Sequence, residues 1–270
     1  MHLLVSKQNI GELAADTIKS RVAAFAPCAG KPFVLGLPTG ETVLDMYARL
    51  RQLYSQHLLD FQHVTVFHMD EYIGLSAQDP HSYGFYLKQQ LFDFVNLTPS
   101  HIHLLNGNAA DLTAECQAYE NLIKQVGAIH LFIGGVGCNG HIAFNEPGSA
   151  FTSRTRPVPL AEGTRQANSR FFQKDLSQVP SQALTVGIGT LLEAKELLFL
   201  ATGPQKAPAV AKALGEEISP QVPLSALRLH PRATLLADEE ACSLLPTPLQ
   251  YQLRQAQLDD PHATQWKLEI

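Results

Sequence analysis

The sequence contains little cysteine and only one tryptophan. Its four cysteines lie far apart in a chain of 270 residues, and they form no CxxC pair. This spacing excludes a dense disulfide framework and matches no zinc site, so it favours reduced thiols in a cytoplasmic protein. We therefore expect no metal ligand set among the cysteines, which are Cys28, Cys116, Cys138 and Cys242.

The sequence also lacks long apolar runs and blocks of basic residues. No run of about 18 apolar residues is present to cross a bilayer, and Lys7 and Asp16 interrupt the first residues too early for a secretory signal. The formal charge of −5, without a basic cluster, is a poor match for nucleic acid or an anionic membrane. We expect a small-molecule ligand, no nucleic acid and no membrane partner.

Apolar residues are plentiful and regularly spaced. They make up 45% of the chain, against 17% for charged residues, which is enough for one large core. Apolar runs typical of buried strands alternate with segments of helical spacing, which predicts an α/β fold: a doubly wound, mostly parallel, Rossmann-like sheet with helices on both faces. We expect a single domain over residues 1–270, with strands at 33–37, 64–67, 130–133, 183–186, 197–201 and 233–237 and helices at 9–25, 43–50, 82–94, 112–126 and 189–194.

The richest motif is HLFIGGVGCNGHIAFNEP, at residues 130–147. An apolar strand runs into four glycines, which is typical of a strand whose carboxyl end meets a ligand, because glycine lets the backbone bend sharply and approach closely. His141 and Glu146 follow these glycines. The motif is equally compatible with an ordinary tight turn and a loop histidine satisfied by hydrogen bonds.

Two other strand ends have an anion-binding layout. GLPTGET at 36–42 and TGPQK at 202–206 both place glycine between a strand and a helix start, where free N–H groups and the helix dipole favour negative charge. Lys206 adds a positive charge of the kind that phosphate sites use. GLPTGET lacks the lysine and spacing of a P-loop, so nucleotide binding is not implied. Turns capped by Thr39 or Thr42, and a solvated Lys206, are the plain alternatives.

Two adjacent carboxylates follow the strand at 64–67. Asp70 and Glu71 lie where ligands bind in open α/β sheets, beyond the carboxyl ends of strands, so one of them is a candidate for proton transfer. The alternative is that Asp70 caps the next helix or pairs with a basic residue.

The segment after the central motif has no strong periodicity. Residues 148–182 contain prolines and several arginines. An excursion of this length in a compact domain is usually a lid or a subunit contact. We expect a lid-like excursion whose arginines could clamp an anion.

Seven segments, in order along nearly the whole chain, resemble the glucosamine-6-phosphate deaminase family, which is also described as the glucosamine/galactosamine-6-phosphate isomerase family. The long GVGxNGHIAFNEP and ANSRFF blocks are far more specific than a single glycine motif. The segments are GLPTG (36–40), MDEY (69–72), GVGxNGHIAFNEP (135–147), SRTR (153–156), ANSRFF (167–172), LTVGIGTLL (184–192) and GxQKA (203–207).

The resemblance implies the conversion of D-glucosamine 6-phosphate and water to D-fructose 6-phosphate and ammonia in N-acetylglucosamine catabolism, without a metal or organic cofactor. Asp70 maps onto the general base that moves a proton from C2 to C1, and His141 onto the residue that opens the sugar ring. Glu146 maps onto the carboxylate that orients His141. Asn139 stands where enterobacterial members have aspartate, and we expect its amide to hold the imidazole ring of His141 by hydrogen bonding.

The resemblance also implies a phosphate site. Its mapped residues are the backbone amides of Gly40, Glu41 and Thr42, together with Arg170 and Lys206. Glu41 stands where glycine or serine is usual. Because a carboxylate facing a phosphate would repel it, we expect the Glu41 side chain to point to solvent.

Regulation is a further implication. Enterobacterial members are hexamers activated by N-acetylglucosamine 6-phosphate, so the resemblance implies a homo-oligomer with this effector. Ser149 and Arg156 match residues of the effector site, and Tyr251 aligns loosely with its tyrosine. Val158 departs from the pattern, because a lysine is expected there.

Three alternatives stay open at this point. A galactosamine-6-phosphate deaminase differs in its substrate by one epimeric hydroxyl. The 6-phosphogluconolactonases share a GGxGxDGH element, but they are not expected to carry MDEY or FNEP. A non-catalytic sugar-phosphate sensor would usually have lost the general base, and Asp70 is present.

Overall fold

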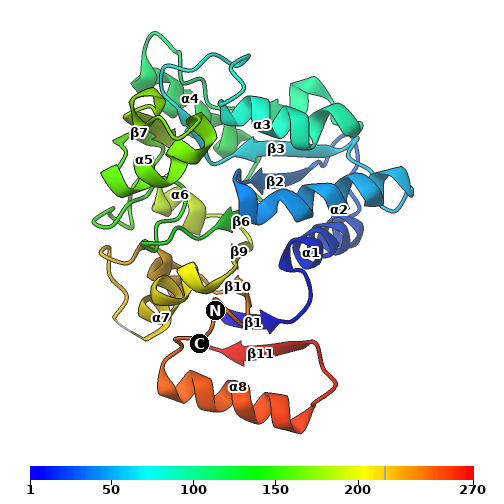
Figure 1. Cartoon of the computed structure of the whole chain (residues 1–270). Helices are drawn as coiled ribbons and strands as arrows, with labels where there is room; N and C mark the ends of the chain where they lie inside the picture. The colour runs from blue at the N-terminus through cyan, green and yellow to red at the C-terminus, as the bar shows by residue number, and fades with distance from the viewer. Residues whose placement is uncertain (216) are drawn as a thin grey trace.

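The computed structural model of this protein describes residues 1–215 and 217–270. An eight-stranded sheet runs through it in the order β11-β1-β10-β9-β6-β2-β3-β5 (Figure 1). Neighbouring strands are parallel except for β11 with β1, so the predicted fold class is confirmed. The strands are β1 (His2–Ser6), β2 (Phe33–Leu37), β3 (Val64–His68), β5 (Ile102–His103), β6 (Leu131–Gly135), β9 (Leu197–Ala201), β10 (Ala233–Asp238) and β11 (Gln265–Glu269).

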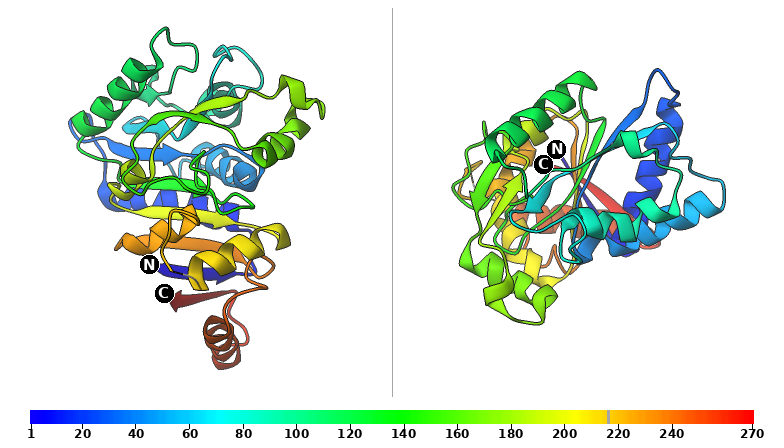
Figure 2. Two further views of the ribbon diagram at one scale, coloured as in Figure 1. Left: turned by 90° about the vertical axis from the view of Figure 1, so that its left-hand side faces the viewer. Right: turned by 90° about the horizontal axis from the view of Figure 1, so that it is seen from above.

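Helices cover both faces of this sheet. The blue helices α1 and α2 lie on one side, and the green and yellow helices α4 and α7 lie on the other (Figure 2). Buried side chains of α3 join the first group, and those of α6 and α8 join the second. The helices are α1 (Ile10–Phe25), α2 (Leu44–Ser55), α3 (Tyr83–Gln90), α4 (Leu112–Gln125), α6 (Ile188–Leu192), α7 (Ala207–Gly215) and α8 (Thr247–Asp259).

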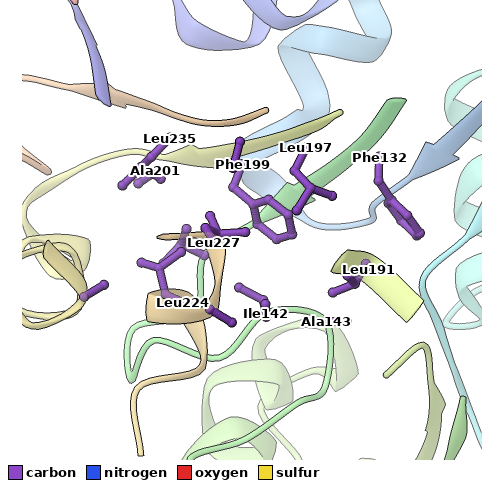
Figure 3. Packing of buried hydrophobic residues seen from close by; sticks show 14 of the residues in the cluster. Phe132, Ile142, Ala143, Leu191, Leu197, Phe199, Ala201, Leu224, Leu227 and Leu235 are labelled. Carbon is purple, nitrogen blue, oxygen red and sulfur yellow. The ribbon is translucent and has the colours of Figure 1, made fainter. Parts of the chain in front are cut away.

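The strands divide their side chains between two cores, because successive residues point to opposite faces. Leu198 and Leu200 of β9 pack under α1 and α2, whereas Phe199 packs on the opposite face. Phe199 lies beside Gly134 of β6, where a Cβ atom would come within 2.2 Å of its ring. Glycine at 134 is therefore needed for the packing shown in Figure 3.

A second, three-stranded antiparallel sheet stands beside the first. Its order is β4-β8-β7, with bounds Asp70–Tyr72, Gln182–Thr185 and Arg156–Pro159. The strand predicted at 183–186 lies here, so its placement in the parallel sheet was wrong. The excursion also contains a strand, β7, which the sequence did not predict because it includes Pro157 and Pro159. Proline is tolerated in an edge strand, and β7 is the edge strand of the small sheet, paired with β8.

The two chain ends meet at one edge of the large sheet. β11 pairs antiparallel with β1, which places the termini side by side (Figure 1). Trp266 and Leu268 of β11 are buried, and α8 packs Leu249 against the same core. The sequence pattern predicted neither β1 nor β11, and β11 is the edge strand on this side. Within residues 1–215 and 217–270, no helix is long and apolar enough to cross a membrane.

Candidate active site

The residues predicted to form the site lie beyond the carboxyl ends of four central strands of the large sheet. β9, β6, β2 and β3 are adjacent and parallel, so their carboxyl ends are neighbours. The glycine loop that carries His141 follows β6, and the GLPTGET turn follows β2. Asp70 follows β3, and Lys206 lies in the turn after β9. Convergence at the carboxyl edge is the usual place for a ligand site in such sheets.

The loop after β6 has a backbone that only its glycines allow. Gly140 has φ +84°, in the left-handed region. The ring of His141 lies over Gly137, where a Cβ atom would come within 2.4 Å of the ring. The next residue, Ile142, is buried and points into the core (Figure 3). The turn at Gly140, the space left by Gly137 and the buried side chain of Ile142 thus fix the position of the imidazole.

A small polar network surrounds Glu146. The Asn139 amide donates to Glu146 Oε2 over 2.7 Å, and the backbone N–H of His141 donates to Asn139 Oδ1 over 3.1 Å. Asn139 therefore bonds to Glu146 and to the backbone of His141, whereas we expected it to hold the imidazole ring itself. His141 Nδ1 lies 3.6 Å from Oε2, an ion-pair distance longer than a hydrogen bond. The Thr164 hydroxyl donates to Oε1.

Glu146 stays ionised in this network. Burial acts to raise its pKa, but His141 and the donors Thr164 and Asn139 outweigh it and lower the pKa to about 2. A fixed carboxylate beside an imidazole orients the ring and stabilises its protonated form. The arrangement can therefore move protons at His141.

The two adjacent carboxylates have different surroundings. Glu71 accepts the backbone N–H groups of Tyr72, Tyr83 and Gly84, so it caps the start of α3. Asp70 is only 6% exposed and has no hydrogen-bond partner among the described residues. Burial, helped by the neighbouring Glu71 charge, raises the pKa of Asp70 to about 8. The alternative that Asp70 is a helix cap is thereby excluded.

Asp70 is linked to the His141 loop through β8. It stands opposite Thr185 in the β4–β8 register, and the Thr185 hydroxyl accepts the backbone N–H of Phe144. The small antiparallel sheet thus ties the carboxylate to the motif that carries His141 and Glu146. This link could not be seen in the sequence, because it depends on a strand pairing between residues more than 100 positions apart.

The turn after β2 lies against the excursion. Gly40 has φ +111°, and the Tyr86 hydroxyl donates to its carbonyl oxygen over 2.8 Å, which fixes the turn. The Glu41 carboxylate lies 3.1 Å from the Arg170 guanidinium, and both side chains are 54% exposed. Glu41 is thus half exposed and its carboxylate pairs with Arg170, whereas we expected it to point to solvent. Thr42 lies in the same short turn, η1 (Glu41–Val43).

Lys206 lies on the other side of the His141 loop. It ends the short turn η6 (Pro204–Lys206), and its Nζ donates to Cys138 Sγ over 3.4 Å. Arg170 and Lys206 therefore approach the site from two different segments. Among residues 1–215 and 217–270, no group of three or more His, Cys, Asp or Glu side chains is placed to hold a metal ion.

The residues matched to an effector site come together only in part. Arg156 donates to Ser149 over 3.3 Å and to Asn145 over 2.9 Å. Val158 is only 8% exposed and packs in the apolar cluster of the small sheet. Tyr251 is 65% exposed and lies on α8, the helix next to β11 (Figure 1).

Sequence reasoning missed several polar residues of the site. Thr164 and Asn168 lie on α5 (Glu162–Asn168), and Asn168 donates to the Tyr72 hydroxyl over 2.9 Å. Tyr72 and Asn168 belong to the MDEY and ANSRFF motifs, which could have marked them. Thr164 lies in no motif that was singled out, so only the folded chain reveals its contact.

Comparison with known proteins places this site in a family. The family described as glucosamine-6-phosphate isomerases/6-phosphogluconolactonase matches residues 6–236. A glucosamine-6-phosphate deaminase of Porphyromonas gingivalis is 49% identical over 85% of this chain and 87% of its own length. One from Vibrio campbellii is 50% identical over 87% of this chain and 89% of its own length.

Solved structures agree. A monomeric glucosamine-6-phosphate deaminase has TM-score 0.86 and 42% identity, over 90% of this chain and all of its own. A 6-phosphogluconolactonase of Thermotoga maritima, with TM-score 0.69 and 17% identity over 87% of this chain and 98% of its own, shares the fold. The chain belongs to the glucosamine-6-phosphate isomerase/6-phosphogluconolactonase family, in its glucosamine-6-phosphate deaminase branch.

Proposed function

We propose that this protein converts D-glucosamine 6-phosphate and water to D-fructose 6-phosphate and ammonia. The observation that carries the proposal is the pair of proton-transfer groups at one sheet edge: a buried, unpartnered Asp70 and a His141 held beside an ionised Glu146. The direct test is release of ammonia from glucosamine 6-phosphate, with Asp70→Asn as the control. Galactosamine 6-phosphate, assayed in parallel, tests the epimeric alternative.

The first step opens the sugar ring. His141 accepts the proton of the anomeric hydroxyl and returns a proton to the ring oxygen, which breaks the bond between C1 and the ring oxygen and forms the aldehyde. Glu146 is ionised and accepts a hydrogen bond from Asn139. Its negative charge balances the positive charge on the imidazole during this transfer.

The second step moves the carbonyl and releases the amine. Asp70 takes the proton from C2 while the aldehyde oxygen at C1 takes a proton from the substrate ammonium, which gives a neutral enol-amine. Asp70 then returns its proton to C1, which leaves an iminium group at C2. Water adds to the iminium carbon, ammonia departs, and fructose 6-phosphate remains. The substrate ammonium beside C2 favours the ionised form of Asp70, which offsets the burial that raises its pKa in the free protein.

The substrate phosphate binds between the turn after β2 and two cations. We assign it to the backbone amides of Gly40, Glu41 and Thr42, with Arg170 and Lys206. The ion pair between Arg170 and Glu41 supports this assignment. Because of it, the Arg170 guanidinium lies next to the turn whose amides would bind the phosphate.

The non-catalytic alternative finds no support at the site. A sensor would need the phosphate-binding groups only, whereas this chain also keeps Asp70, His141 and Glu146 in ordered surroundings. The lactonase alternative is disfavoured because the hydrolysis of a lactone has no use for a base at C2.

Assembly and regulation stay predictions. The resemblance implies a homohexamer activated by N-acetylglucosamine 6-phosphate, whereas the solved relative at 42% identity is described as monomeric. Within the chain, the buried Val158 contributes no charge beside Ser149 and Arg156. Light scattering and substrate saturation curves, with and without the acetylated sugar phosphate, test both. A cytoplasmic location stays a prediction as well.

A further inference from the structure

The excursion makes one direct contact with the proposed catalytic carboxylate. Thr164 is buried on the inner side of α5, and its hydroxyl donates to Glu146 Oε1. The other oxygen, Oε2, accepts the Asn139 amide and faces His141 Nδ1. Each carboxylate oxygen is therefore held by a different segment of the chain, and one of these segments is the excursion.

The rest of α5 and the turn after it contact other parts of the site. Asn168 donates to the hydroxyl of Tyr72, two residues after Asp70, and Arg170 pairs with Glu41 of the phosphate turn. The segment 164–170 thus bridges the three loops that carry the proposed ring-opening, base and phosphate groups. Of its side chains, Thr164 is the one that bonds to Glu146.

We propose that Thr164 is a positioning residue that couples the docking of α5 to the orientation of Glu146, so that His141 has a correctly aimed carboxylate only while α5 covers the site. This inference rests on the proposed function, because it assigns Thr164 a part in the ring-opening step. Thr164 itself does not touch the reacting atoms.

The physical reason lies in the two oxygens of the carboxylate. With both oxygens held, Glu146 cannot rotate about its terminal torsion, which is otherwise broad. His141 Nδ1 is buried and has no hydrogen-bond partner among residues 1–215 and 217–270. It lies 3.6 Å from Oε2, so a small change in carboxylate orientation makes or breaks this contact. Without the Thr164 donor, only the Asn139 amide holds the carboxylate, at Oε2, and the group can pivot about that one bond.

Loss of the Thr164 hydroxyl should also change the pH dependence. The titratable group that faces Glu146 is His141, and the other two donors, Asn139 and Thr164, are neutral. Burial raises the pKa of Glu146 and the hydrogen-bond donors lower it. Removing the Thr164 donor therefore raises this pKa. The acid side of the kcat profile, which reports the substrate complex in which Asp70 is ionised, then shifts to higher pH.

The experiment compares three variants of the full chain. Thr164→Val keeps the volume and removes the hydroxyl, whereas Thr164→Ser keeps the hydroxyl. Gln166→Ala is the matched control, because Gln166 is an exposed residue of the same helix whose side chain, within the part of the chain that the structure describes, bonds only to Glu162. For each variant kcat, KM and the pH profile are measured, together with binding of an open-chain amino-hexitol 6-phosphate, which needs no ring opening to bind.

We expect Thr164→Val to lower kcat about 10- to 100-fold, the loss typical of a hydrogen bond to a charged group, and to leave KM and binding of the open-chain ligand unchanged. Thr164→Ser should retain most activity, and Gln166→Ala all of it. Unchanged kcat and pH profile in Thr164→Val would overturn the inference, as would an equal loss in Gln166→Ala. If the unaltered protein releases no ammonia, the proposed function itself fails.

Discussion

The Glu41 carboxylate lies 3.1 Å from the Arg170 guanidinium, so an anion of the chain itself pairs with one of the proposed phosphate-binding cations. Both side chains are half exposed, and ion pairs of this kind contribute little to stability. A phosphate dianion could therefore replace the carboxylate at low cost. The pair also joins the excursion to the turn after β2.

This arrangement predicts the effect of Glu41→Gln. Removing the competing carboxylate should lower KM by about two- to fivefold, the range expected for an exposed pair, and leave kcat unchanged. Initial rates at varied substrate concentration measure it. Glu12→Gln, an exposed residue of α1, is the control with the same charge change. An unchanged or higher KM in Glu41→Gln alone would show that Glu41 does not compete with the phosphate.

The buried Asp70 predicts how activity depends on pH. A general base must be ionised, and burial raises the pKa of Asp70 to about 8 in the free protein, so kcat/KM should rise with pH up to that value. Carbon-13 NMR of aspartate-labelled protein observes the carboxyl directly, and the signal lost in Asp70→Asn identifies it. Titration of that signal near the ordinary value for aspartate would contradict the assignment.

The same group predicts a pH-dependent effect on stability. Because the pKa of Asp70 is raised in the folded state, that state binds more protons than the unfolded state between about pH 4 and pH 8, and its stability falls as pH rises through this window. Asp70→Asn removes the penalty. The variant should melt several degrees above the unaltered protein near pH 8, with the difference shrinking toward pH 4. Equal differences at both values would refute this.

Asn139→Asp tests how the site tolerates a second carboxylate. The amide nitrogen lies 2.7 Å from Glu146 Oε2, and an aspartate oxygen in its place would repel Glu146 unless one of the two is protonated. The pair should keep a proton to higher pH, which shifts the acid side of the turnover profile upward. Asn121→Asp, at an exposed position on α4, is the control. Identical profiles for all three proteins would mean that residue 139 does not tune the site.

The sequence predicts the main sheet well where a strand is buried on both faces. β2 and β9 were predicted with their observed bounds, because an uninterrupted apolar run between turn residues is unambiguous. The edge strands β7 and β11 were missed: the first is built around two prolines, and the second pairs with the opposite end of the chain. Local pattern carries no information about such partners.

The candidate site was predictable in its members but not in its contacts. The motifs identify His141 and Glu146, yet nothing local shows which of Asp70 and Glu71 caps α3, because both follow the same strand. The structure separates them by hydrogen bonding, because three backbone N–H groups donate to Glu71. The bond from Thr164 depends on how α5 docks against a loop 18 residues earlier, which no spacing rule describes.

The most direct test of the account measures ammonia release from glucosamine 6-phosphate by the unaltered protein and by Asp70→Asn. We predict steady release that is equimolar with fructose 6-phosphate, and a loss of about 100- to 10,000-fold in the variant, the range for a missing general base. The variant should still bind an open-chain amino-hexitol 6-phosphate. No release by the folded, unaltered protein, or equal release by Asp70→Asn, would contradict the central claim.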